Sequence, residues 1–292
     1  MNILISKLPP KNWWGEGIPD YPDNIAMQPG IVPNQKVLNY ERNHLINILN
    51  NNNIKIIETE YPKTSNGKTP NHDFVFIRDQ FISDLKGNVI ILNIRQQNRV
   101  DEIPFIYKLL ENLDVSIKKM PDHKGMYAEG GEFFFCEKEN ILFSGLNRNS
   151  IKGSEKIAEM MNVKELITIK TNAFHLDTIF SPVFNNMNKL CAIIICLDLV
   201  EKKSKLDLLK WVKNKGITLL NIEPKDSIGY KKNLGTLAVN SLQLPGILIS
   251  PSEFSDSEII KKLDRLAIKR IVSPTSQYML SGGSIHCITN QI

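Results

Sequence analysis

Short apolar runs rich in β-branched residues recur along this chain and alternate with longer segments of helical periodicity. Such runs predict strands, and the longer segments, several of which begin near Ser or Asp, predict helices. The predicted strands cover 54–59, 73–77, 89–94, 132–136, 141–144, 191–197, 236–239, 247–250 and 285–289. The predicted helices cover 36–50, 101–112, 151–161, 206–214 and 255–266.

This alternation indicates a mixed α/β protein. Polar or glycine turns separate the short strands at intervals of tens of residues, which favours repeated small units of sheet and helix. The chain has 292 residues, 42% of them hydrophobic, which is enough for a substantial core. It has no long Pro-rich or Gly/Ser-rich linker, so we predict a single domain over 1–292.

Composition argues against several classes of protein. The 36 basic residues are dispersed and the net charge is only +5, so we expect no nucleic-acid partner. No segment reaches the ~18 apolar residues of a membrane span, and the apolar start is too short for a signal peptide. The four cysteines form no CxxC pair, which disfavours a zinc ribbon or a disulfide framework. We expect a cytoplasmic protein with reduced thiols and with no metal or cofactor.

The end of the chain carries the first candidate for chemistry. Cys287 follows a Gly-Gly pair within an apolar run, which predicts a strand that presents a thiol. Strand alternation turns the ring of His286 to the opposite face. A nucleophilic thiol needs a positive neighbour that lowers its pKa or a group that removes its proton on demand. We expect His175 to fill that role, because His175 and Asp177 point the same way from an extended segment.

Two further charged segments are ambiguous when taken alone. The sequence Glu-Gly-Gly-Glu at 129–132 allows a sharp turn with close backbone approach, or an ordinary hairpin. Arg78 and Asp79 end a predicted strand, where a surface ion pair is the alternative to a binding site. The pair His175 and Asp177 is also compatible with a surface turn. The combination of these segments in this order carries more weight than any one of them.

Together these segments resemble the motifs of the guanidine-modifying superfamily, which includes arginine deiminases, dimethylarginine dimethylaminohydrolases, agmatine deiminases and amidinotransferases. The sequence Phe-Ile-Arg-Asp-Gln-Phe at 76–81 resembles the arginine deiminase segment FxRDxF, 129–132 resembles EGGD, and Phe-His-Leu-Asp-Thr at 174–178 resembles HLDT. The sequence Gly-Gly-Ser-Ile-His-Cys at 282–287 resembles the terminal GG-x-x-x-C, and its IHCIT wording is especially similar to agmatine deiminases. The resemblance spans most of the chain.

The resemblance implies an α/β fold, a five-bladed pseudo-symmetric propeller (pentein) of ββαβ-type units around a central polar site. It implies that Cys287 is the nucleophile, that His175 is the general acid and base, and that Glu129 orients this histidine. It further implies that Asp79 and Asp177 bind the guanidinium group of a small-molecule substrate. A homo-oligomer is compatible with the resemblance.

These roles fit the chemistry of a guanidinium group, which is planar, permanently charged and rich in N–H donors, so that two carboxylates in its plane form a natural receptor. Attack of the thiolate on the central carbon gives a covalent S-amidino intermediate. His175 protonates the departing amine and then activates water. We therefore expect a hydrolase of linear amidines that resembles arginine deiminase and converts arginine to citrulline and ammonia.

Departures from each subfamily bear on the substrate. Glu132 stands where the superfamily usually has Asp, and the residue before Gly282 is not the third glycine of many members. Agmatine deiminases usually have RDTGP where this chain has Arg-Asp-Gln-Phe-Ile at 78–82, and dimethylarginine hydrolases usually have HLK in place of His-Leu-Asp. Arginine is therefore favoured. We expect Arg148 to bind its α-carboxylate, with Arg99 as second candidate and a solvated surface arginine as the alternative for either.

Three functions remain open at this stage. The first is a hydrolase of arginine or a close relative, including a dihydrolase, a dimethylarginine dimethylaminohydrolase or an agmatine deiminase. The second is an amidinotransferase, which passes the same intermediate to an acceptor amine. The third is a non-catalytic guanidine-binding protein, which the thiol disfavours because a pure binder does not need one. The other cysteines, Cys136, Cys191 and Cys196, lie in apolar runs and are expected to be core thiols.

Overall fold

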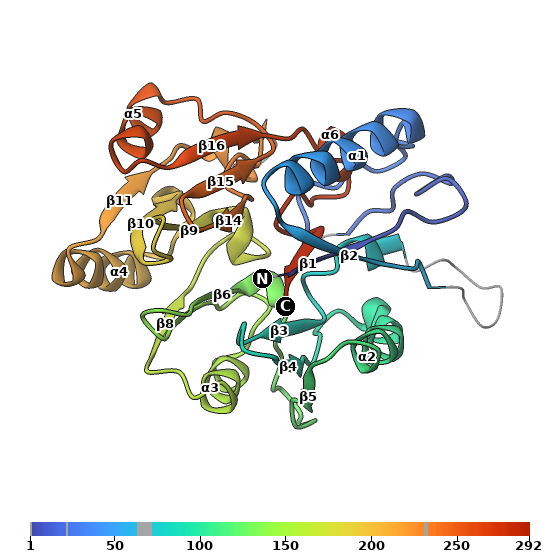
Figure 1. The fold of residues 1–292 in the computed structure, drawn as a ribbon, viewed down its shortest axis with the longest axis horizontal. Helices are drawn as coiled ribbons and strands as arrows, with labels where there is room; N and C mark the ends of the chain where they lie inside the picture. Colours follow the sequence, from blue (N-terminus) through green and yellow to red (C-terminus); the bar gives the residue numbers. More distant parts are fainter. Residues whose placement is uncertain (1, 22, 63–71, 231–232) are drawn as a thin grey trace.

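The computed structural model describes residues 2–21, 23–62, 72–230 and 233–292 (Figure 1). The helices are α1 (Gln35–Asn51), α2 (Ile103–Glu111), α3 (Ile151–Met160), α4 (Lys202–Lys215), α5 (Ser257–Arg265) and α6 (Ser276–Met279). The strands are β1 (Asn2–Ser6), β2 (Lys55–Thr59), β3 (Phe81–Ser83), β4 (Asn88–Ile91), β5 (Ser116–Lys119), β6 (Phe133–Cys136), β7 (Ile141–Gly145), β8 (Glu165–Ile169), β9 (Phe180–Phe184), β10 (Leu190–Ile195), β11 (Thr218–Asn221), β12 (Gly229–Tyr230), β13 (Asn233–Leu234), β14 (Leu242–Leu244), β15 (Ile247–Ser250), β16 (Lys269–Val272) and β17 (Thr289–Gln291).

The strands of the described ranges form five sheets of three strands and one sheet of two. The three-stranded sheets have the orders β17-β1-β2, β3-β4-β5, β6-β7-β8, β9-β10-β11 and β14-β15-β16. In each of them the middle strand runs antiparallel to the first and parallel to the third. One of the helices α1 to α5 joins each parallel pair, because parallel neighbours require a crossover connection.

Figure 1 shows the sheets grouped around the centre of the molecule, with α1 to α5 on the outside and both chain termini near the centre. The first and last strands meet in one sheet, where Ile3 aligns with Gln291 and Ile5 with Thr289. This pairing holds the segment just before β17, which contains Cys287, in the interior of the molecule.

The middle strands are continuous apolar runs because both of their faces are covered. In β10, the residues from Ala192 to Ile195 are fully buried. The helices α1, α3 and α5 begin at polar residues whose side chains accept backbone N–H groups of the first turn. For example, the Ser150 hydroxyl accepts the Gly153 N–H at 3.0 Å at the start of α3. None of the helices in the described part of the chain is long and apolar enough to cross a membrane.

Three predicted strands are wrong. Residues 73–77 enter a 3-10 helix (His72–Val75) and a turn, and 236–239 form no strand. Residues 285–288 form a turn, since the Ile288 N–H donates to the Ser284 carbonyl at 3.0 Å. The extended segment expected at 175–177 runs instead into a 3-10 helix (Leu176–Thr178). In each case local hydrogen bonds override the strand preference of apolar and β-branched residues.

Candidate active site

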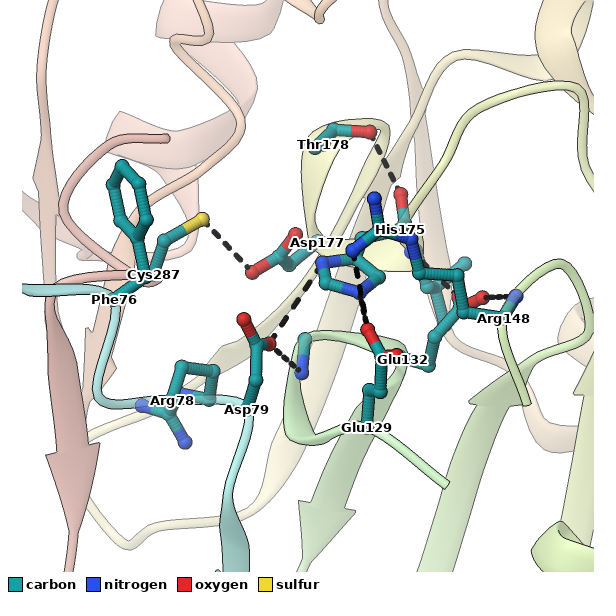
Figure 2. A network of polar contacts seen from close by, with 12 residues as sticks. Phe76, Arg78, Asp79, Glu129, Glu132, Arg148, His175, Asp177, Thr178 and Cys287 are labelled. Carbon is teal, nitrogen blue, oxygen red and sulfur yellow. Dashed lines mark hydrogen bonds and ion pairs between the residues drawn. The ribbon is translucent and has the colours of Figure 1, made fainter. Parts of the chain in front are cut away.

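A small polar pocket is lined by most of the predicted site residues. Its lining includes Asp79, Arg99, Arg148, His175 and Cys287. The two remaining predicted residues are fully buried and contact this lining: Glu129 bonds to His175, and Asp177 bonds to Cys287 (Figure 2). The structure therefore brings together all seven residues that the sequence singled out.

The Cys287 thiol is buried and lies between an acid and an amide. Its Sγ donates to Asp177 Oδ2 at 3.3 Å and accepts from Asn240 Nδ2 at 3.2 Å. Burial, with the negative charges of Asp177 and Asp79, raises the pKa of Cys287 well above its usual value. These surroundings therefore keep the sulfur protonated as a thiol unless a positive charge offsets the two acids.

His175 is fixed at Nε2 by an ion pair with Glu129, whereas its Nδ1 lies near Asp79 and makes no hydrogen bond to any residue that the structure describes. Its Nε2 lies 2.7 Å from Glu129 Oε2, and its Nδ1 lies 3.8 Å from Asp79 Oδ1. Burial lowers the pKa of His175, but the charge of Asp79 and the bond to Glu129 outweigh it and raise the pKa overall. The imidazole can therefore carry a proton at Nδ1 toward a bound molecule.

Glu129 is held so that it cannot turn away from this histidine. Its Oε1 accepts the backbone N–H groups of Arg95 at 3.0 Å and Gln96 at 3.3 Å, and its Oε2 pairs with Arg148 at 3.2 Å. Burial raises the pKa of Glu129, but the hydrogen bond from His175 and the charge of Arg148 lower it well below its usual value. The carboxylate therefore stays ionised beside the imidazole.

The two glycines that follow Glu129 allow this close approach. A Cβ at Gly131 would lie 2.6 Å from His175 Nδ1 and 2.9 Å from Asp79 Oδ1. The Gly131 N–H donates to the same Asp79 oxygen at 3.0 Å. The Glu-Gly-Gly-Glu segment is thus neither a hairpin nor a surface turn: it forms a 3-10 turn (Gly130–Glu132) at the site.

Arg99 is buried against acids rather than solvated. Its Nη1 pairs with Asp79 and its Nη2 lies 2.9 Å from Glu102 Oε2. The same Nη2 donates to the carbonyls of Asp73 and Phe76, each at 3.0 Å. Arg99 therefore touches the cavity while its guanidinium orients Asp79.

Arg148 lies at the cavity and pairs with one buried and one exposed acid. Its Nη1 contacts Glu129, its Nη2 lies 2.9 Å from Asp23 Oδ2, and its guanidinium carbon lies 5.1 Å from the centre of the Phe174 ring. The Asp23 side chain is 44% exposed, so it can turn into water when another anion binds. Arg148 can therefore exchange Asp23 for another carboxylate, whereas both acids that bond to Arg99 are buried.

Two residues of the site were missed by the sequence analysis. His286 was expected to point away, which is wrong: its Nδ1 lies 2.8 Å from Asp177 Oδ2, because 285–288 is a turn and not a strand. Asn240 Nδ2 donates to the Asp177 carbonyl at 3.0 Å, and its Oδ1 accepts the His286 N–H at 3.0 Å. No local pattern marks Asn240, since its partners are distant in sequence.

Glu132 has a structural position beneath the site. Its carboxylate accepts backbone N–H groups from Asn147 at 3.1 Å, Arg148 at 2.7 Å and Leu176 at 2.8 Å, which joins two loops. A Cβ at Gly145 would lie 1.7 Å from Glu132 Oε2. The longer acid, found where the superfamily usually has Asp, therefore occupies the space that Gly145 leaves.

Gly145→Ala should destabilise the protein by roughly 1–3 kcal/mol, because the new methyl group displaces the Glu132 carboxylate in a packed interior. Urea unfolding followed by circular dichroism measures the loss. Adding Glu132→Asp to Gly145→Ala shortens the acid and should recover part of the stability, although Glu132→Asp alone is destabilising. A single Gly145→Ala variant as stable as the wild type would contradict this account.

The other cysteines lie outside the cavity. Cys136 and Cys196 are fully buried, Cys191 is half-buried in β10, and burial raises the pKa of all three. In the part of the chain that the structure describes, no group of three or more His, Cys, Asp or Glu side chains is arranged to hold a metal ion. Cys287 is the cysteine that faces the cavity among the described residues.

Comparison with known proteins gives one family match. The model of the family described as N,N dimethylarginine dimethylhydrolase, eukaryotic, matches residues 31–292. No curated protein sequence matches the chain.

Several solved structures share the fold. The N-terminal domain of ArgZ, covalently bound to a reaction intermediate, has 18% identity and a TM-score of 0.80, over 99% of this chain and 97% of that domain. ArgZ is described as an arginine dihydrolase from cyanobacteria. Unliganded AgrE has 18% identity and a TM-score of 0.80, but this chain spans only 39% of it.

A dimethylarginine dimethylaminohydrolase variant, an adduct with S-methyl-L-thiocitrulline, has 14% identity and a TM-score of 0.72, over 100% of this chain and 99% of that one. At such identities the structures establish the fold alone. The family match covers most of the chain and includes every predicted site residue. The chain therefore belongs to the eukaryotic N,N-dimethylarginine dimethylhydrolase family, within the guanidino-modifying pentein superfamily.

Proposed function

We propose that this protein is a cysteine-dependent hydrolase of a small guanidino compound and that arginine is its substrate. The observation that carries the proposal is the state of Asp177: it is fully buried, one oxygen receives the Cys287 thiol, and the other, Oδ1, has no hydrogen-bond partner among the described residues. A buried acceptor without a donor is costly. The N–H group of a guanidinium at the sulfur would supply that donor.

The bound guanidinium lies between Asp79 and Asp177. Two carboxylates in its plane accept N–H groups from both terminal nitrogens, and each such bond is charge-assisted. The cation also offsets the acids that raise the pKa of Cys287, so the thiolate becomes favoured when substrate binds. Binding of the correct substrate thus activates the nucleophile.

Binding of the cationic substrate first releases the proton of the Cys287 thiol to solvent, and the later steps balance with the residues present. Cys287 Sγ forms a bond to the central guanidinium carbon, and His175 Nδ1 donates its proton to one terminal nitrogen as the bond from carbon to that nitrogen breaks. Ammonia leaves and an S-amidino adduct remains. The neutral His175 then takes one proton from water while the water oxygen attacks the carbon and the bond to sulfur breaks, and the released ammonia takes the second proton of the water. The products are citrulline and ammonium, and the thiolate and the protonated His175 are restored.

We propose Arg148 as the partner of the substrate α-carboxylate, which would displace the exposed Asp23. Arg99 is the second candidate, although its guanidinium already bonds to Asp79 and Glu102.

The five sheets of repeated ββαβ order support a five-bladed propeller, with this site at its centre.

Dimethylarginine is a second candidate substrate, because the matching family model is that of N,N-dimethylarginine dimethylhydrolases. The adduct formed from it is the same, with dimethylamine as the leaving group. An amidinotransferase also shares the adduct and differs in using an acceptor amine in place of water. Incubation with arginine, methylated arginines and agmatine, with ammonia, amines and ureido products measured separately, distinguishes these reactions.

We expect kcat/KM for arginine to exceed that for asymmetric dimethylarginine by about tenfold to a hundredfold or more. Two methyl groups remove N–H donors and leave a buried carboxylate underpaired, which costs ~1–3 kcal/mol. Asp177→Asn should weaken turnover of arginine far more than that of methylated substrates. Faster turnover of dimethylarginine than of every unsubstituted guanidine by the wild type would transfer the assignment to dimethylarginine.

A further inference from the structure

We propose that His286 is a positioning residue that holds Asp177 by one oxygen and so leaves the other oxygen free for the guanidinium of the substrate. This inference rests on the proposed function, since it concerns the receptor for that guanidinium. It assigns a specific task to a buried histidine that takes no part in the proton transfers described above.

The His286 ring is held on several sides. Its Nδ1 lies 2.8 Å from Asp177 Oδ2, and its face stacks on Phe134 with ring centres 4.6 Å apart and planes at 28°. Its backbone N–H donates to Asn240 Oδ1 at 3.0 Å. The side chain is almost fully buried. A ring fixed in this way can present its Nδ1 in one direction only.

The protonation of the pair follows from these contacts. Burial and the charge of Arg78 lower the pKa of His286 to about 4, despite the opposing effect of Asp177. The imidazole is therefore neutral near pH 7 and carries one proton. Because an ionised carboxylate only accepts hydrogen bonds, that proton must lie on Nδ1. The bond is a donation from His286 Nδ1 to Asp177 Oδ2.

The two oxygens of Asp177 are consequently unequal. Oδ2 receives the N–H of His286 and the thiol of Cys287, whereas Oδ1 receives no bond from the described residues. Without the N–H donor of His286, the hydrogen bond from the Cys287 thiol would be the one remaining contact, among the described residues, that distinguishes Oδ2 from Oδ1. The carboxylate could then rotate, and its free acceptor would no longer face the guanidinium at a constant angle.

Three substitutions at His286 distinguish the effect of losing the hydrogen-bond donor from the effect of losing the ring. His286→Phe keeps a ring against Phe134 and removes the donor. His286→Asn places an amide nitrogen the same number of bonds from Cα as Nδ1, and His286→Gln places one the same number of bonds from Cα as Nε2. We expect KM for arginine to rise about tenfold to a hundredfold in His286→Phe and His286→Gln, with a smaller change in kcat. His286→Asn should stay within about fivefold of the wild type.

The pH profile gives a readout that a merely structural role would not move. Asp177 interacts with His286, Cys287 and His175 and with the charge of Arg78, and Asp79 acts on the same Cys287 thiol. Burial raises the pKa of Asp177, but the bond and charge of His286 outweigh it and lower the pKa overall. Removal of the donor therefore raises this pKa, so the acidic limb of kcat/KM should move upward by about one pH unit in His286→Phe and not in His286→Asn.

Two measurements keep this inference separate from the proposed function. In the wild type, ¹⁵N shifts of the His286 imidazole, assigned by their loss in His286→Phe, should report the Nδ1–H tautomer at pH 7, whether or not any substrate is turned over. Thermal unfolding of each variant, with His44→Phe on α1 as a matched control, reports any general loss of structure.

The outcomes are distinct. The Nδ1–H tautomer with rescue by Asn and not by Gln supports the proposal. An Nε2–H tautomer, an imidazolium at pH 7, rescue by Gln, or loss of activity that only follows loss of stability overturns it. A wild type without activity on any guanidino compound refutes the proposed function, while the tautomer still reports on the pair.

Discussion

Cys287→Ser should bind arginine and fail to turn it over, with a fall in kcat of roughly 10⁴-fold or more. A serine hydroxyl has too high a pKa to ionise beside Asp177 and Asp79, even when a cation is bound, whereas a thiolate becomes accessible. The guanidinium receptor is unchanged, so calorimetry should still detect binding. The loss is measured as citrulline and ammonia released over several hours.

The wild type provides the complementary observation. Intact-mass spectra of acid-quenched reactions should show an adduct on Cys287 with the mass of arginine less ammonia. Cys191→Ser is the matched control, since its thiol donates to the Val183 carbonyl at 3.3 Å outside the cavity and a hydroxyl can make the same bond. An active Cys287→Ser enzyme, together with the absence of any adduct on Cys287, would rule out nucleophilic catalysis.

His175→Ala should slow the chemical step by roughly 10²-fold or more, which is the usual contribution of a general acid and base. Under the proposed mechanism the variant lacks the proton for the departing amine and the base for water, while Cys287, Asp79 and Asp177 remain. Single-turnover kinetics isolates this step from product release. The loss should be smaller for an amidine whose leaving group departs without protonation.

The control for this variant is His123→Ala, because His123 is an exposed histidine. His175→Ala also leaves the Glu129 carboxylate without its partner at 2.7 Å, so the melting temperature must be followed alongside the rate. Near-normal single-turnover rates in a folded His175→Ala enzyme would move proton transfer to another residue.

The predicted helices agree with the structure where the periodicity is regular: 36–50 corresponds to α1, 151–161 to α3 and 255–266 to α5. Strands that lie at the edges of sheets were harder to recognise. For example, β5 reads Ser-Ile-Lys-Lys and is largely exposed, so it shows neither an apolar run nor a clear alternation. Strands this short take their conformation from the neighbour they pair with, which is not encoded locally.

The site residues could be recognised in the sequence by their resemblance to ordered motifs, but their geometry could not be predicted in that way. Cys287 and His286 were placed on opposite faces because a β-branched, apolar segment was taken as a strand. The turn at 285–288 depends on Asn240, whose amide group bonds to both of their backbone N–H groups. Such contacts join parts of the chain more than forty residues apart, and a single sequence carries no record of them.

The pairing of β1 with β17 affects when the site can form during synthesis on the ribosome. These strands are the first and last of the described fold, and the sheet β17-β1-β2 places the reactive turn in the interior. Contacts of such separation form slowly in folding, because the loop entropy must be overcome first. On the ribosome, Cys287 and β17 are made after the strands of the other described sheets, so a nascent chain contains Asp79, His175 and Asp177 before Cys287 is added. We expect activity to appear only after Cys287 and β17 have been synthesised and β17 can pair with β1.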